Sequence, residues 1–202
     1  MLKPFYKPSV VEAGCDEAGR GCLAGSVYAA AVVFPPDYRN QELNDSKQLS
    51  ARQRYSLRET IINDALSWAV GVVTPQEIDS LNILNASILA MHRALDQLSV
   101  IPEHIIVDGN SFKTYANIPH TTIIKGDGKY LSIAAASILA KTFRDDYMER
   151  LAMEYPQYDW LSNKGYPTRK HRLALRKYGL TPYHRKTFNL FGDTQLELPF
   201  GE

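Results

Sequence analysis

The segment Val27–Phe34 is apolar at every position and stops at Pro35 and Pro36. A strand that is apolar on both faces is typical of the interior of a sheet that helices cover. The segment Val10–Cys15 predicts a strand shortly before it, and two strands so close in sequence favour an antiparallel hairpin. This pair therefore constrains the chain to a sheet that has at least one antiparallel connection and is covered by helices.

Strand and helix patterns alternate through the next hundred or so residues, which predicts an α/β domain with a mixed sheet. Ser50 and Gln53 form a capping-box pattern at the start of one helix. Pro75 is typical of the first turn of a short helix. The apolar stripe expected on the first helix is Leu57, Ile61, Ile62 and Leu66. The other strands are expected at 68–73, 105–107 and 121–124, and the other helices at 83–98, 132–154 and 168–178.

The chain changes character after Pro156, where it becomes aromatic and basic. Net charge over the 202 residues is +1, yet residues 163–188 hold eight Lys or Arg and no acid. Such a block predicts either a surface for a polyanion or a solvated helix face. We expect its helix, closed by Gly179, to form a small appendage over the sheet.

Several classes of protein are excluded or disfavoured. No apolar run reaches the ~18 residues that a membrane-spanning helix needs, and the N-terminus lacks the apolar core of a secretory signal. The two cysteines, Cys15 and Cys22, do not suggest a disulfide framework or a zinc site. We expect a cytoplasmic monomer that binds no membrane.

Four acidic residues follow predicted strands or begin loops: Asp16, Glu17, Asp108 and Asp127. Carboxylates at strand ends converge on one crevice in open α/β sheets. Converging carboxylates stay ionised only where cations bind, and oxygen ligands favour Mg²⁺ or Mn²⁺. Adjacent strand residues point to opposite faces, so Asp16 and Glu17 share such a site only if the strand bends or ends there. A turn or cap residue is the alternative for each lone Asp.

The glycine-rich stretch Ala18–Gly21 directly follows the first acidic pair. Glycines allow backbone N–H groups to approach a phosphate or a sugar closely. The sequence therefore predicts a ligand-binding turn beside the acidic residues.

These segments together resemble the signature of the ribonuclease HII family. The resemblance covers roughly residues 11–190, and the joint order of its motifs is highly specific. The matching segments are 16–21 (DEAGRG), 23–25 (LAG), 43–49 (LNDSKQL), 107–109 (VDG), 125–127 (KGD), 133–141 (IAAASILAK), 164–168 (KGYPT) and His171.

The resemblance implies a ribonuclease H-like α/β fold, with a catalytic domain at 1–160, a basic helical extension at 161–190 and a tail at 191–202. It implies hydrolysis of the RNA strand of RNA–DNA hybrids and incision of duplex DNA 5′ of single embedded ribonucleotides. The implied mechanism uses two metal ions, Mn²⁺ or Mg²⁺, and leaves 5′-phosphate and 3′-hydroxyl ends. Asp16, Glu17, Asp108 and Asp127 match the family's catalytic, metal-binding residues.

The resemblance also implies a set of substrate-binding residues. Gly19, Arg20 and Gly21 match the turn that senses the ribose 2′-hydroxyl, which is the group that distinguishes RNA from DNA. Tyr166 matches a tyrosine that stacks on the sugar at the junction, and Lys47 matches a lysine that contacts phosphate. The family commonly has prolines near this turn, where this chain has Cys22 and Ser26, which puts the stiffness of the turn in question.

The last segment holds Gln195, Leu196, Leu198 and Phe200. These residues resemble the short peptide by which bacterial replication proteins bind the sliding clamp, and alternate apolar side chains of a tail can enter a partner's pocket. The alternative is that they fold back on the body of the protein.

Two other functions compete with this interpretation. A phosphotransferase of the actin-like superfamily could use Asp108 and Gly109 as a phosphate turn, although such enzymes usually pair two such domains. A nucleic-acid-binding module without catalysis would depend on the basic block alone, but converging acids would repel phosphate unless cations bind.

Overall fold

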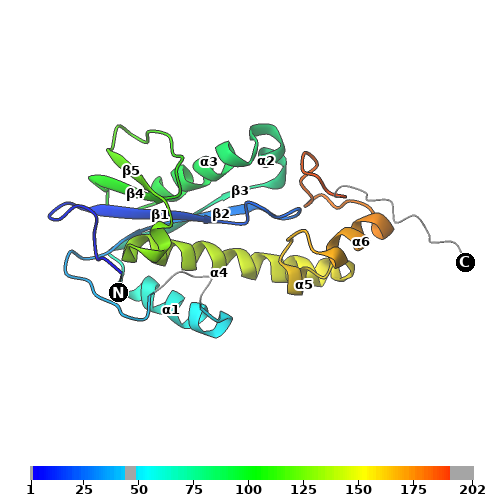
Figure 1. Cartoon of the computed structure of the whole chain (residues 1–202), viewed down its shortest axis with the longest axis horizontal. Coiled ribbons are helices and arrows are strands. Elements are labelled where there is room, and N and C mark those ends of the chain that lie inside the picture. Colours follow the sequence, from blue (N-terminus) through cyan, green and yellow to red (C-terminus); the bar gives the residue numbers. More distant parts are fainter. Residues whose placement is uncertain (1, 44–48, 192–202) are drawn as a thin grey trace, which may run out of the picture.

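A five-stranded mixed sheet is the centre of the fold, as Figure 1 shows. The computed structural model describes residues 2–43 and 49–191. The sheet order is β3-β2-β1-β4-β5. The strands are β1 (Glu12–Ala18), β2 (Val27–Val33), β3 (Ser67–Val73), β4 (His104–Asp108) and β5 (His120–Ile123).

The predicted hairpin and mixed sheet are confirmed. Strands β1 and β2 pair antiparallel, as do β2 and β3, whereas β1 pairs parallel with β4 and β4 with β5. Every residue of β2 is buried. Its side chains alternate between two cores, so Ala29 packs on one face and Ala30 on the other. The apolar character of this strand on both faces is thus explained.

Helices cover both faces of the sheet, as Figure 1 shows, with α3 above it and α1 and α4 below it in that view. The upper core contains Ala90 and Met91 of α3, and the lower core contains Leu57 of α1 and Leu139 of α4. The helices are α1 (Ala51–Asp64), α2 (Pro75–Leu81), α3 (Ile83–Leu95), α4 (Leu131–Glu154), α5 (Trp160–Asn163) and α6 (Arg169–Tyr178), with short 3₁₀ turns η1 (Gly126–Gly128) and η2 (Pro156–Tyr158).

Local signals in the sequence set several helix ends as predicted. Ser50 and Gln53 form the expected capping box, and Pro75 occupies the first turn of α2. One prediction was wrong: Leu66 is not on the buried stripe of α1. The helix ends at Asp64, and Leu66 is 52% exposed in the turn before β3.

The expectation that the basic C-terminal helix lies over the sheet was also wrong. Figure 1 shows α5 and α6 around the far end of α4, beyond the edge of the sheet. Trp160 and Leu175 pack there against Met148 of α4 and against Leu23 and Ala24, which precede β2. The apolar residues of this segment therefore form a core of their own around the protruding end of α4. In the part of the chain that the structure describes, no helix is both long and apolar enough to cross a membrane.

Gly14 allows α4 to lie directly against β1. A Cβ atom at this position would lie 2.5 Å from the backbone N of Ile133, far inside van der Waals contact. The close approach places the first turns of α4 beside the carboxyl end of β1. A larger residue would have to push the helix away from the sheet.

We expect Gly14→Ala to lower the free energy of unfolding by about 1–3 kcal/mol, because the new methyl group meets backbone atoms that have no room to move. Urea unfolding followed by circular dichroism measures the change. Gly128→Ala is the matched control, since a Cβ atom there meets nothing within 4 Å. Equal stability of the two variants would contradict the packing argument.

Candidate active site

Three carboxylates meet at one edge of the sheet. One carboxylate oxygen each from Asp16, Asp108 and Asp127 lies within 4.8 Å of the other two. Asp16 belongs to β1, Asp108 ends β4, and Asp127 lies in η1 after β5. Asp16 and Asp127 are buried, with 4% and 3% of their surfaces exposed.

Strand register explains why these residues meet. Cys15 of β1 lies beside Val107 of β4 in a parallel pair, so the next residues, Asp16 and Asp108, come out at the same end of adjacent strands. The η1 turn adds the third carboxylate. Its Gly126 N–H donates to Asp108 Oδ1 at 2.7 Å, which fixes that carboxyl group beside the turn.

The three-carboxylate cluster is electrostatically unfavourable in the chain alone. Burial raises the pKa of Asp16 well above its usual range, and the negative charges of Glu17 and Asp108 raise it further. Hydrogen bonds from Ser137 and from the Glu17 N–H act in the opposite direction. A cation among these oxygens would remove the repulsion and allow the carboxylates to ionise.

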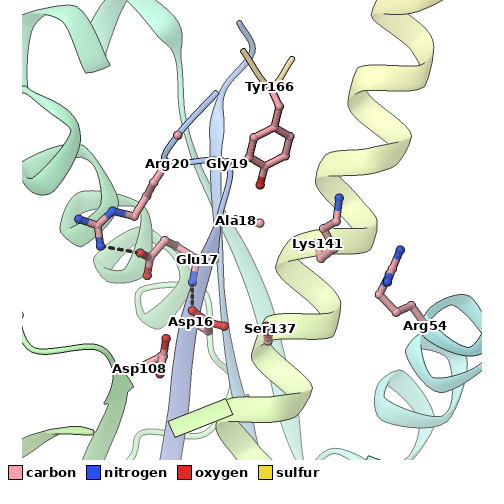
Figure 2. Close-up of a pocket in the computed structure, with 11 residues that line it drawn as sticks. Asp16, Glu17, Ala18, Gly19, Arg20, Arg54, Asp108, Ser137, Lys141 and Tyr166 are labelled. Carbon is pink, nitrogen blue, oxygen red and sulfur yellow. Dashed lines mark hydrogen bonds and ion pairs between the residues drawn. The ribbon is translucent and has the colours of Figure 1, made fainter. Parts of the chain in front are cut away.

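Glu17 lies close to the cluster without being part of it. Strand β1 continues to Ala18 and stays paired with β2 through the acidic pair, so the side chains of Asp16 and Glu17 alternate as in any strand. The Glu17 Oε1 atom instead accepts a hydrogen bond from Arg20 Nη1 at 3.0 Å, as Figure 2 shows. Burial still raises the pKa of Glu17, and the Arg20 charge lowers it. The charge of Asp108 raises the pKa of Glu17 as well, so Glu17 interacts both with the cluster and, through Arg20, with the glycine turn.

A cavity of about 260 Å³ opens beside the cluster. The acidic residues and the glycine turn form one side of it, and α4 and α1 contribute the other side, as Figure 2 shows. The lining residues are Asp16, Glu17, Ala18, Gly19, Arg20, Gly21, Arg54, Asp108, Ser137, Lys141 and Tyr166. Asp127 belongs to the cluster but is not among the residues that line the cavity.

The glycine turn has a backbone that only glycine adopts without strain. Gly19 has a φ of +95°, and a Cβ atom there would lie 2.9 Å from the Arg144 Cζ atom. A Cβ atom at Gly21 would meet nothing within 4 Å. Gly19 is thus required by the fold of the chain itself, whereas the chain leaves open space beside Gly21.

Tyr166 reaches the cavity from the C-terminal segment and is 41% exposed. Its backbone is held by His171, whose Nε2 atom accepts from Trp160 Nε1 at 3.0 Å. The proton of this imidazole is therefore on Nδ1, which donates to the Tyr166 carbonyl at 2.9 Å. Burial lowers the pKa of His171, which favours this neutral form.

Besides Ala18, three polar lining residues were not predicted as site residues. Ser137 and Lys141 lie one turn apart on α4, and Lys141 Nζ is 2.6 Å from Asp145 Oδ1. Both belong to the 133–141 motif, and their i, i+4 spacing places them on one helix face, so this signal was available. Arg54 reaches the cavity from α1, and no motif in the sequence marked it.

The basic block is only partly a charged surface. Arg169, Lys170, Arg176, Lys177 and Lys186 are exposed. Arg185 is completely buried, and Arg172 donates to the carbonyls of Asn189 and Leu190. Lys164 Nζ donates to Glu149 Oε1 and to the Leu161 carbonyl, and Arg176 Nη2 donates to the Phe191 carbonyl. Four of the eight cations counted in the sequence thus form hydrogen bonds to the chain itself.

Some predicted residues cannot be placed. Lys47 and the tail residues Gln195, Leu196, Leu198 and Phe200 lie outside the described residues.

Comparisons with known proteins agree with this geometry. A family model described as Ribonuclease HII matches residues 13–191. A ribonuclease HII of Bacteroides thetaiotaomicron is 70% identical over 200 residues, covering 99% of this chain and 100% of the relative.

Two solved structures share the fold. The crystal structure of ribonuclease H2 from Pyrococcus horikoshii has a TM-score of 0.75 at 28% identity and covers 89% of this chain and 94% of its own. The ribonuclease HII in a complex with PCNA from Archaeoglobus fulgidus has a TM-score of 0.74 at 25% identity, covering 88% and 95%. The ribonuclease H-like fold is thereby confirmed.

Proposed function

This chain belongs to the ribonuclease HII family, and from that premise we propose that it is an endoribonuclease that acts on RNA–DNA hybrids and on duplex DNA with embedded ribonucleotides. It cuts on the 5′ side of the ribonucleotide and leaves a 5′-phosphate and a 3′-hydroxyl. The observation that carries the proposal is the meeting of Asp16, Asp108 and Asp127 within 4.8 Å beside a glycine turn.

The family is metal-dependent, and the acidic cluster fits divalent cations. Its donors are carboxylate oxygens only, which favour Mg²⁺ or Mn²⁺ over softer metals. Burial raises the pKa of Asp16, and the charges of Glu17 and Asp108 raise it further; a bound cation would offset both effects. When bound, two such ions supply an activated water and stabilise the leaving oxygen of a phosphodiester.

The residues of the chain orient the substrate around that chemistry. Asp16, Asp108 and Asp127 would hold the metal from three separate elements, and Glu17 extends the site toward the glycine turn. Tyr166 offers its exposed ring to the sugar at the RNA–DNA junction. The exposed cations of α6 supply contacts to phosphates that are independent of sequence.

The glycine turn supplies selectivity for ribose. A site that pairs a hydroxyl group rejects a substrate that lacks it, because its own polar groups are left without partners. The backbone N–H groups of Arg20 and Gly21 are the donors proposed for this role, and Lys47 is proposed to bind a neighbouring phosphate. A purely binding module does not account for a buried three-carboxylate cluster, and the family match displaces the phosphotransferase alternative.

We expect Asp108→Asn or Asp16→Asn to lower cleavage by roughly three orders of magnitude and to leave binding largely intact, because each removes a metal ligand without removing a phosphate contact. A labelled DNA duplex with one ribonucleotide, incubated with EDTA, Mg²⁺ or Mn²⁺, reports the nick and its position. Cleavage by the unmodified protein should need the cation.

Asp37→Asn is the matched control, since it removes an exposed carboxylate remote from the cavity lining. Full activity of either cluster variant in Mn²⁺, or cleavage in EDTA, would refute the metal site. Absence of any nick by the unmodified protein in both metals would refute the proposed activity.

Gly21→Ala tests whether substrate occupies the space beside the turn. The variant should unfold at the wild-type temperature or slightly above, because alanine restricts the unfolded chain and meets no atom of the folded one. Its kcat/KM on a duplex with a single ribonucleotide should fall about tenfold or more, since the methyl group enters the space that the sugar needs. Gly19→Ala should lose stability as well as activity. Wild-type kcat/KM for Gly21→Ala would place the substrate elsewhere.

We further propose that the tail binds the replication sliding clamp through Gln195, Leu196, Leu198 and Phe200. The support is the tail's resemblance to clamp-binding peptides and the likeness of this chain to a ribonuclease HII solved in complex with PCNA. Titration of purified clamp with the full chain and with a chain ending at Asp193 should show binding by the full chain only. Equal affinity of both would end the proposal.

A further inference from the structure

We propose that Arg185 is a positioning residue for ribose selectivity: it orients the glycine turn without contacting the substrate. The inference deepens the proposed function and rests on it. Arg185 is 0% exposed and belongs to the extension, remote in sequence from the turn that it holds.

The Arg185 guanidinium group binds the turn through backbone carbonyls. Its Nη2 donates to Gly19 O at 2.7 Å, and its Nη1 donates to Arg20 O at 2.8 Å. Its Nε and Nη2 both donate to Gly25 O, at 3.0 and 2.8 Å. Charge-assisted bonds of this kind are the stronger class of hydrogen bond. One side chain thus joins both ends of the loop that contains the turn.

These bonds determine where the N–H groups of the turn point. In a planar trans peptide, the carbonyl and the following N–H group point in opposite directions, and the described residues contain no cis peptide. With the carbonyls of Gly19 and Arg20 turned toward Arg185, the N–H groups of Arg20 and Gly21 are turned away from it. Within the described part of the chain, no acceptor takes either N–H group.

The Arg185 backbone is itself fixed against the loop. Its N–H donates to Leu23 O at 2.9 Å, and the N–H of Gly25 donates to Tyr183 O at 2.9 Å. On the other side, Asp79 accepts from the N–H groups of Lys186 and Thr187 at 2.9 and 3.0 Å. The backbone that carries the Arg185 guanidinium is therefore held by hydrogen bonds on both sides.

Arg144 of α4 supports the turn from a second direction. Its guanidinium is also completely buried, and it donates to the carbonyls of Ser26, Ala24 and Lys164. Its side chain occupies the space that a Cβ atom of Gly19 would need. Arg144 packs on the turn, but of the two guanidinium groups only that of Arg185 binds the carbonyls of Gly19 and Arg20.

A site for ribose must hold its donors in place before the substrate arrives, because a turn that can rotate its peptides loses the contrast between a paired and an unpaired hydroxyl. Lysine cannot replace Arg185 here, since an ammonium group lacks the planar fork that reaches several carbonyls at once. Arg185→Lys should therefore weaken selectivity more than it weakens the chemical step.

The test compares kcat/KM on two duplexes that differ only at the scissile nucleotide, one with ribose and one with 2′-fluoro-2′-deoxyribose. Their ratio is independent of the fraction of active protein, so a loss of stability alone does not move it. We expect Arg185→Lys to lower the ratio about tenfold, the equivalent of one well-made hydrogen bond. The matched control is Arg172→Lys, which alters another arginine that binds only backbone carbonyls of the extension.

If Arg185→Lys gives no folded protein, Asp79→Ala loosens the same segment from a half-buried site, and it should shift the ratio in the same direction by a smaller factor. The inference would be overturned if the ratio of the two kcat/KM values stayed at the wild-type value in Arg185→Lys, or, where that variant does not fold, in Asp79→Ala. An equal shift of the ratio in Arg172→Lys would also overturn it. Failure of the unmodified protein to cleave the ribose duplex would instead count against the proposed function.

Discussion

The convergence of three carboxylates is the constraint on which the rest of the site depends: burial raises the pKa of Asp16, and the neighbouring charges of Glu17 and Asp108 raise it further. Asp16 and Asp108 are adjacent because β1 and β4 are parallel neighbours. The pair would separate if the strands were free to splay, so the sheet needs support from both faces. Gly14 provides part of that support by allowing α4 to lie against β1, and Ser137 of the same helix donates a hydrogen bond to Asp16. The scaffold thus holds together groups that favour separation until a cation binds.

Two buried arginine side chains support the glycine turn on the other side of the site. The guanidinium groups of Arg144 and Arg185 have backbone carbonyls, not carboxylates, as their hydrogen-bond partners. Burying an unpaired charge is expensive, and several charge-assisted bonds per group are needed to offset it. Burial lowers the pKa of Arg185 to about 10, which leaves it charged at neutral pH. The positive charge beneath the turn also favours approach of a polyanion.

The sequence predicted the features that depend on local patterns and missed those that depend on distant contacts. The strands, the helix caps at Ser50 and Pro75, and the convergence of Asp16, Asp108 and Asp127 follow from apolar periodicity and from parallel pairing. The position of Glu17 outside the three-carboxylate cluster follows from strand alternation, once β1 is known to continue to Ala18.

The positions of α5 and α6 could not be read locally, because they depend on contacts between the extension and residues near position 24. Charge counting likewise cannot distinguish a cation that contacts solvent from one, such as Arg185, that binds carbonyls of the loop before β2.

Contacts from distant parts of the chain explain how the glycine turn is held in place without the prolines that the family commonly has near it. Cys22 and Ser26 restrict the backbone less than proline would. The stiffness comes instead from bonds across the loop: the carbonyls of Gly19, Arg20 and Gly25 go to Arg185, and those of Ala24 and Ser26 go to Arg144. The acidic cluster proposed for catalysis is thus placed by strand pairing, whereas the turn proposed for selectivity is held by bonds from α4 and the extension. On the proposed roles, substitutions in the extension are therefore expected to alter which sugar is recognised while the acidic cluster stays intact.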